Sequence, residues 1–178
     1  MPATIAIPRP GADEHIAYYA KYIQQAPGDD ALDSLRVTGE SLLTLMKGVS
    51  EAQGLDRYAP GKWSVKEMLN HVTDGERVFG YRALRFARAD RTPLPGFDEN
   101  AWAPAAGSDR RPLAEIVEEF RAVRAASLAL FSSLDGEALT RRGEANQCEI
   151  SVRALAWIIA GHSRHHENLF RERYGLGR

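Results

Sequence analysis

The chain of 178 residues has a single cysteine, Cys148, so it cannot form an internal disulfide. Its 23 basic and 24 acidic residues nearly balance, which leaves no general positive field to attract a nucleic acid. The longest apolar run, 154–161, is far shorter than the roughly 20 residues of a membrane-spanning helix. These absences exclude a disulfide scaffold. They favour a protein of the reducing cytoplasm that binds neither nucleic acid nor membrane.

What the chain does contain is helical periodicity, because apolar residues recur at spacings of three and four along four long segments. We expect these helices at about 30–49, from Ser64 up to the loop at 90, at 112–134 and at 151–174, after a short helix at about 13–25 and an extended segment at 1–11. No alternating pattern is long enough for a sheet. The expected fold class is therefore all-α, with residues 1–178 forming one four-helix-bundle domain.

Two segments between these helices are less regular. Residues 90–107 are rich in proline, glycine and aromatics and have no helical period, so we expect a long ordered loop. The loop is either functional and packed across the bundle or a mere connector. Residues 137–150 are polar and are expected to hold one short helical turn and one extended piece. Cys148 lies there and is interpreted as a loop or element-edge residue rather than a nucleophile.

Histidines lie on the apolar faces of two expected helices. His162 and His166 are four residues apart, so their rings are neighbours and can reach one ion. His71 lies on the inward stripe of the helix that starts at Ser64, and Gly75, one turn on, leaves space above it. Three imidazoles would leave a coordination position open, as in catalytic metal sites. The alternative is that the histidines are ordinary polar residues of the core.

Other residues are candidates for the surroundings of this site. Asp74 and Glu76 follow His71 closely, and either could accept a hydrogen bond from an imidazole, although such acids are more often solvated. His165 is the rival ligand to His166. On helical geometry it points about 100° away from its neighbour, so His166 is preferred.

The histidine pair differs from the metalloprotease motif, because Ser163 stands where that motif has a glutamate base. A metal could still lower the pKa of a water or a thiol without a protein base, and no catalytic residue is assigned. Arginines recur every third residue from Arg82 to Arg91. We expect them to form a solvated face, with Arg82 or Arg85 as a weaker candidate for holding an anionic substrate.

Several segments, in this order, resemble the DinB-like superfamily and especially its branch of metal-dependent hydrolases. They are Lys62–Ser64 with His71, Asp74–Arg77, Tyr81–Arg88, Pro93–Asp98 and Ala160–His166. The resemblance covers about residues 18–174. It implies a four-helix bundle with a divalent metal, usually zinc or nickel, held by residues that correspond to His71, His162 and His166.

The resemblance also bears on the reaction and the assembly. It implies a homodimer and, from characterised members, transfer reactions in which the metal activates a low-molecular-weight thiol such as bacillithiol or mycothiol. We therefore expect a metal-dependent enzyme that directs a thiol or a water at a small electrophile, with a cleft lined from the 90–107 loop. The alternative is a non-catalytic metal-binding stress-response protein, which would have a fourth protein ligand and no cleft.

Overall fold

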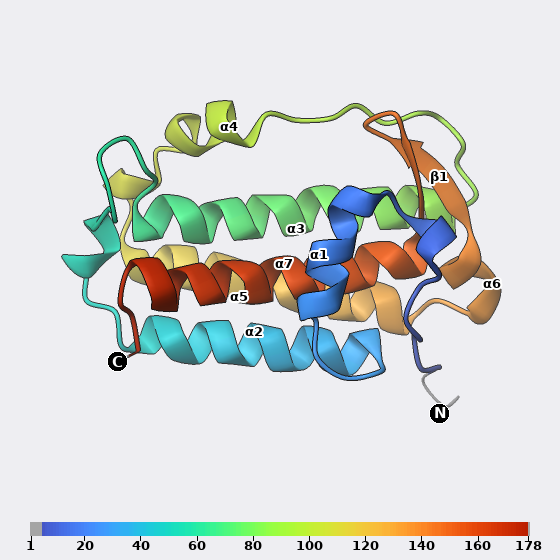
Figure 1. Cartoon of the computed structure of the whole chain (residues 1–178), viewed down its shortest axis with the longest axis horizontal. Helices are drawn as coiled ribbons and strands as arrows, with labels where there is room; N and C mark the ends of the chain where they lie inside the picture. The colour runs from blue at the N-terminus through green and yellow to red at the C-terminus, as the bar shows by residue number, and fades with distance from the viewer. Residues whose placement is uncertain (1–4, 178) are drawn as a thin grey trace.

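A computed structural model describes residues 5–177 and confirms the four-helix bundle within them. The bundle helices are α2 (Ala31–Lys47), α3 (Val65–Ala87), α5 (Leu113–Ser132) and α7 (Val152–Arg173). Helices α3 and α5 run in one direction, and α2 and α7 run in the other (Figure 1). Helix α7 packs against α2 and α3, and α5 packs against the same two helices. No helix of the described residues combines the length and hydrophobicity needed to cross a bilayer.

Local signals in the sequence set the ends of these helices. The Ser64 side chain accepts a hydrogen bond from the Glu67 N–H at 3.0 Å, and the Glu67 carboxylate accepts one from the Ser64 N–H at 2.9 Å. This capping box starts α3 as expected. Asp30 and Ser151 cap α2 and α7 with a single side-chain oxygen each, which accepts a backbone N–H of the first turn. Gly175, with a φ of 68°, follows the end of α7.

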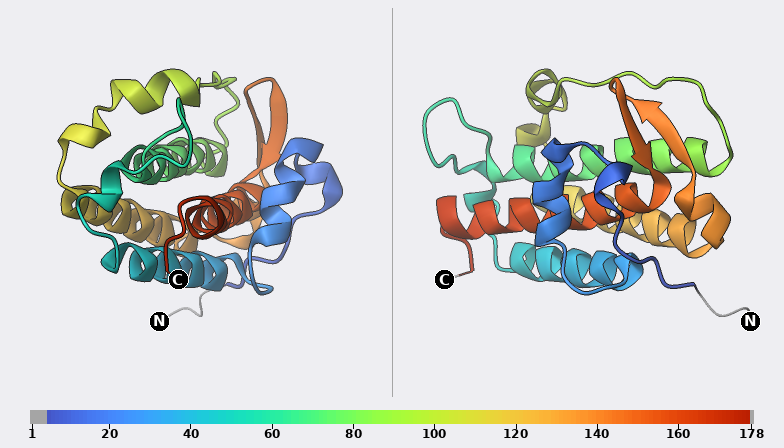
Figure 2. Two further views of the ribbon diagram at one scale, coloured as in Figure 1. Left: turned by 60° about the vertical axis from the view of Figure 1, so that its left-hand side comes forward. Right: turned by 45° about the vertical axis from the view of Figure 1, so that its right-hand side comes forward.

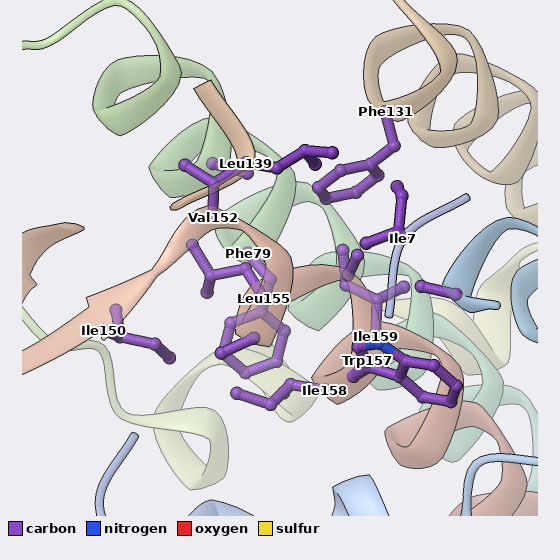
Figure 3. Close-up of a cluster of buried hydrophobic side chains, with 14 of the residues drawn as sticks. Ile7, Phe79, Phe131, Leu139, Ile150, Val152, Leu155, Trp157, Ile158 and Ile159 are labelled. Atoms are coloured by element: carbon purple, nitrogen blue, oxygen red, sulfur yellow. The ribbon is translucent and has the colours of Figure 1, made fainter. Parts of the chain in front are cut away.

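The core is built around the first half of α7, in which every residue from 154 to 160 is buried. Figure 3 shows Leu155, Ile158 and Ile159 of this helix gathered with Phe79 of α3 and Phe131 of α5. A helix that is apolar all round is one that other elements cover on every side. The buried stretch of α7 leads directly into its histidines, and His162 and His166 are buried as well.

The segment between α3 and α5 is long because these two helices run in parallel. Helix α3 is about 35 Å long at about 1.5 Å per residue, and the chain must return over that length before α5 begins (Figure 2). Part of the expected loop at 90–107 is in fact helical, namely α4 (Glu99–Ala105), followed by a 3-10 turn at Ser108–Arg110. Asp98 caps α4, and this signal outweighs the prolines and glycines around it.

The expectation that no sheet forms is wrong. After α6 (Gly136–Thr140), the strands β1 (Arg142–Ala145) and β2 (Cys148–Ser151) pair as an antiparallel hairpin. Asn146 and Gln147 have φ values of 53° and 61°, as a two-residue hairpin turn requires. Four-residue strands are too short to show an alternating pattern. Cys148 is partly exposed at the start of β2, so it lies at an element edge as predicted.

The short N-terminal helix is present but begins later than expected. Helix α1 (Ala17–Gln25) ends at the predicted residue, whereas Asp13 belongs to a separate 3-10 turn at Ala12–Glu14. Residues 1–4 of the expected extended segment lie outside the described residues, and 5–11 form neither helix nor strand. Helix α1 lies across α7 (Figure 1). This crossing needs Gly161, because a Cβ there would lie 1.8 Å from the Tyr22 carbonyl oxygen.

Candidate metal centre

The three histidines singled out in the sequence lie together in the structure. The Nε2 atom of His162 is 3.2 Å from Nε2 of His71 and 3.1 Å from Nε2 of His166. One ligand atom from each ring lies within 4.8 Å of the others. His162 and His166 are buried and His71 is partly exposed. Helices α3 and α7 therefore bring three imidazole nitrogens to one point.

The neighbouring residues are shaped to fit these rings. A Cβ at Gly75 would lie 3.1 Å from Cε1 of His162, so the space predicted at this glycine is occupied by the imidazole from the other helix. The Trp63 ring lies 4.8 Å from the His71 ring, and the Tyr22 ring packs edge-on at 5.4 Å from His162. These two aromatic rings therefore pack against the imidazoles from two sides.

The protonation state of the three histidines suits the binding of a cation. Burial lowers the pKa of His71 to about 4 and lowers the pKa values of His162 and His166 well below the ordinary range, so all three are neutral at pH 7. A neutral imidazole has one nitrogen lone pair available to a cation, so the three Nε2 atoms can each supply one ligand to a single ion. The residues therefore fit a divalent metal ion.

Two of the other candidates do not join the cluster. His165 is partly exposed, and its Nδ1 lies 3.5 Å from Nε2 of Gln25, away from the three converging nitrogens. Asp74 accepts hydrogen bonds from Asn70 at 2.7 Å and from Arg77 at 3.3 Å. Neither residue contacts the point at which the three Nε2 atoms meet.

Glu76 is neither solvated nor bonded to an imidazole. It is buried and accepts two hydrogen bonds of 2.8 Å from the Arg124 guanidinium. Arg124 also donates to the Leu35 carbonyl, the Thr38 hydroxyl and the Ser163 hydroxyl, at 2.6, 3.2 and 2.7 Å. This network joins all four bundle helices beside the histidines, and the sequence pattern of α3 alone did not reveal its partner on α5.

A cleft of about 420 Å³ opens beside His71 and His162. It is bounded by α1, α3, the return segment and the hairpin. The side chains of Tyr18, Tyr19, Tyr22, Phe79, Arg82, Phe97, Glu99 and Asn146 line it. Gly96, Phe97 and Glu99 come from the expected loop, so that segment lines the cleft as predicted. The hairpin supports the segment through two backbone hydrogen bonds. The Leu94 N–H donates to the Glu144 carbonyl at 3.0 Å, and the Asn146 N–H donates to the Leu94 carbonyl at 2.9 Å.

The two arginines considered from the sequence differ in position. Arg82 is buried, with an exposed fraction of 3%, and lines the cleft, so the prediction of a solvated face is wrong for this residue. Arg85 points elsewhere and pairs with Asp90 and with the Tyr81 hydroxyl. A three-residue period drifts around a helix, which is why neighbours in the run face different surroundings.

Comparison with known proteins places the chain in a family. The family model of the DinB superfamily matches residues 34–169. The chain belongs to the DinB superfamily. Among solved structures, YfiT from Bacillus subtilis matches this DinB-superfamily protein with a TM-score of 0.70 and 19% sequence identity, and the match covers 93% of each chain. YfiT is described as a probable metal-dependent hydrolase with an unusual four-helix bundle topology. That likeness shows a shared fold. No curated protein sequence matches significantly.

Proposed function

We propose that this protein is a divalent-metal-dependent enzyme that acts on a small electrophilic substrate. The observation that carries the proposal is the cleft beside His71 and His162. A structural metal site normally takes all its ligands from the protein, whereas a catalytic site keeps a position open. Within residues 5–177, no cysteine or carboxylate joins the three-histidine cluster. The site therefore favours an enzyme over a non-catalytic metal-binding protein.

The residues have distinct proposed roles. His71, His162 and His166 would hold the ion, and zinc or nickel suits three neutral imidazoles. When bound, the ion would supply Lewis acidity that lowers the pKa of a water or of a low-molecular-weight thiol. Glu99 is the carboxylate that lines the cleft, and it would accept the proton that the water or thiol gives up. Tyr22 and Trp63 limit water access from the flanks.

Hydrolysis and thiol transfer both use this arrangement. The description of YfiT as a probable metal-dependent hydrolase supports the first, and the resemblance to thiol-dependent transferases supports the second. A cleft of about 420 Å³ has the size of a small-molecule site, so the substrate and any thiol cosubstrate are small molecules. The homodimer implied by the resemblance stays a prediction.

The test is the coordination of a cobalt(II)-substituted protein. Addition of a small thiol should change the visible spectrum and produce thiolate-to-cobalt charge-transfer absorption, because two of the three histidines that would hold the ion line the cleft. His162→Ala should lose the cobalt spectrum, and His165→Ala should keep it. A cobalt spectrum that responds neither to thiols nor to azide would mean that the ion has no open position, and the enzymatic proposal would then be wrong.

A further inference from the structure

Arg82 is a buried cation without a counter-charge. Its exposed fraction is 3%, and one guanidinium N–H donates to the Pro95 carbonyl at 3.0 Å. Across the described part of the chain, no carboxylate oxygen lies within 4.0 Å of a guanidinium nitrogen of Arg82, the distance that defines an ion pair. Its other close contacts are uncharged: the Tyr19 hydroxyl, which lies beside the guanidinium, and the ring of Phe79, 5.8 Å from the guanidinium carbon. A guanidinium has five N–H donors and stays charged at physiological pH, so most of its hydrogen-bonding capacity is unused.

A second buried arginine, Arg124, has a structural role and allows a comparison of contacts within the same protein. Arg124, with an exposed fraction of 4%, makes five hydrogen bonds, two of them to the carboxylate of Glu76. Burying a charge is costly unless it is paired and hydrogen-bonded, and Arg124 meets that condition. Arg82 does not meet it from the described protein groups. The difference indicates that a ligand supplies the missing anion.

The position of Arg82 connects it with the metal centre. His71, Gly75, Phe79 and Arg82 follow one another at spacings of four, four and three on α3, and all four line the same cleft. The Cα atoms of His71 and Arg82 are eleven residues apart, about 16 Å along the helix axis at about 1.5 Å per residue. Long side chains on a helix lean toward its N-terminus, so the guanidinium approaches the histidine end. A ligand that reaches both is elongated.

The charge of the cleft limits the charge of that ligand. The charged side chains that line it are Arg82 and Glu99, one of each sign. A phosphate dianion would meet one cation and be repelled by one carboxylate. A carboxylate matches a single guanidinium in charge and in its planar, two-oxygen shape. The aromatic rings of Tyr19 and Phe97 provide apolar contact for the body of the molecule.

We propose that Arg82 binds the carboxylate of an elongated organic acid whose reacting group lies at the three-histidine cluster. This assignment names the substrate class and rests on the proposed metal-dependent function. It makes Arg82 a specificity-determining residue. Its role is separate from that of Arg85, one turn further along the same helix, which is already paired with Asp90.

The experiment uses zinc-loaded protein and monohydroxamates of straight-chain dicarboxylic acids. The hydroxamate binds the metal, and the far carboxylate reaches Arg82 when the chain has the right length. Each acid is compared with its terminal amide of equal length by titration calorimetry. Because a hydrogen-bonded charge pair is worth about 1.5–3 kcal/mol, the wild type should bind the best acid about 10- to 150-fold more tightly than its amide.

The variants separate the two arginines. Arg82→Gln should reduce the preference for the acid to within about twofold, and Arg82→Lys should retain part of it because the charge remains. Arg85→Gln is the matched control and should bind like the wild type. Zinc content and circular dichroism establish that each variant is folded and loaded. If Arg82→Gln does not fold, the comparison of Arg82→Lys with Arg85→Lys decides the question.

The outcomes distinguish failure of this assignment from failure of the proposed function. Equal binding of acid and amide by the wild type, or a preference that persists in Arg82→Gln, would overturn the role of Arg82 while leaving the metal site intact. If no hydroxamate binds to zinc-loaded wild type, the open metal position is refuted instead. Titration of metal-free protein with hexanoate and hexanamide then tests Arg82 alone, and equal binding of the two would overturn its role.

Discussion

The buried ion pair between Glu76 and Arg124 makes a sharp stability prediction. Their side chains have exposed fractions of 1% and 5%. Removing one partner leaves an unpaired charge in the core, so Arg124→Met and Glu76→Leu should each lower the free energy of unfolding by about 3–5 kcal/mol. The double variant replaces both charges with apolar groups of similar volume and should lie within about 2 kcal/mol of the wild type. The resulting departure from additivity is at least about 4 kcal/mol.

Urea denaturation of metal-free protein, followed by circular dichroism, measures these free energies without a contribution from metal binding. Arg36→Met is the matched control, because Arg36 pairs with Asp33 on the surface of α2 with an exposed side-chain fraction of 48%. It should change stability by less than about 1 kcal/mol. If the effects of the Glu76 and Arg124 substitutions simply add, the pair is not the desolvated network that the structure shows.

Two further predictions concern α7 and its histidines. Gly161→Ala should destabilise the fold by about 1–2 kcal/mol in urea unfolding, because displacement of Tyr22 outweighs the gain in helix propensity. The space around Gly80 is open, so the control substitution Gly80→Ala should not destabilise the fold. Metal-free stability should be fully present above pH 6.5 and fall toward about pH 4, since the unfolded chain binds more protons. The loss approaches about 1.4 kcal/mol per pH unit per histidine, and an unchanged urea midpoint from pH 7 to 5 would contradict it.

Much of the site was visible in the sequence because helical periodicity is local information. The four-residue spacing of His162 and His166 places their rings on one face of any helix that contains them, and the inward stripe of α3 points His71 at the core. The caps at Ser64 and Ser151 are also local. The sequence therefore predicts which helices form and which imidazoles face inward.

The remainder depends on contacts between distant segments. The partner of Glu76 lies 48 residues away on α5, and the role of Gly39 follows from that partner, because a Cβ there would lie 2.9 Å from Nη1 of Arg124. Gly161 is likewise explained by a helix more than a hundred residues earlier in the chain. Neither glycine carries a local signal. The burial of Arg82 requires knowledge of the return segment, whose short helix α4 and supporting hairpin have weak periodicity.

The measurement that tests the central claim most directly is the metal content of untagged protein by elemental analysis. The wild type should contain about one zinc or nickel per chain. His71→Ala, His162→Ala and His166→Ala should each lose the metal, and His165→Ala should retain it because its ring lies outside the cluster. A wild type that binds no divalent metal even after reconstitution, or a His165→Ala variant that loses it while His166→Ala does not, would contradict the three-histidine centre.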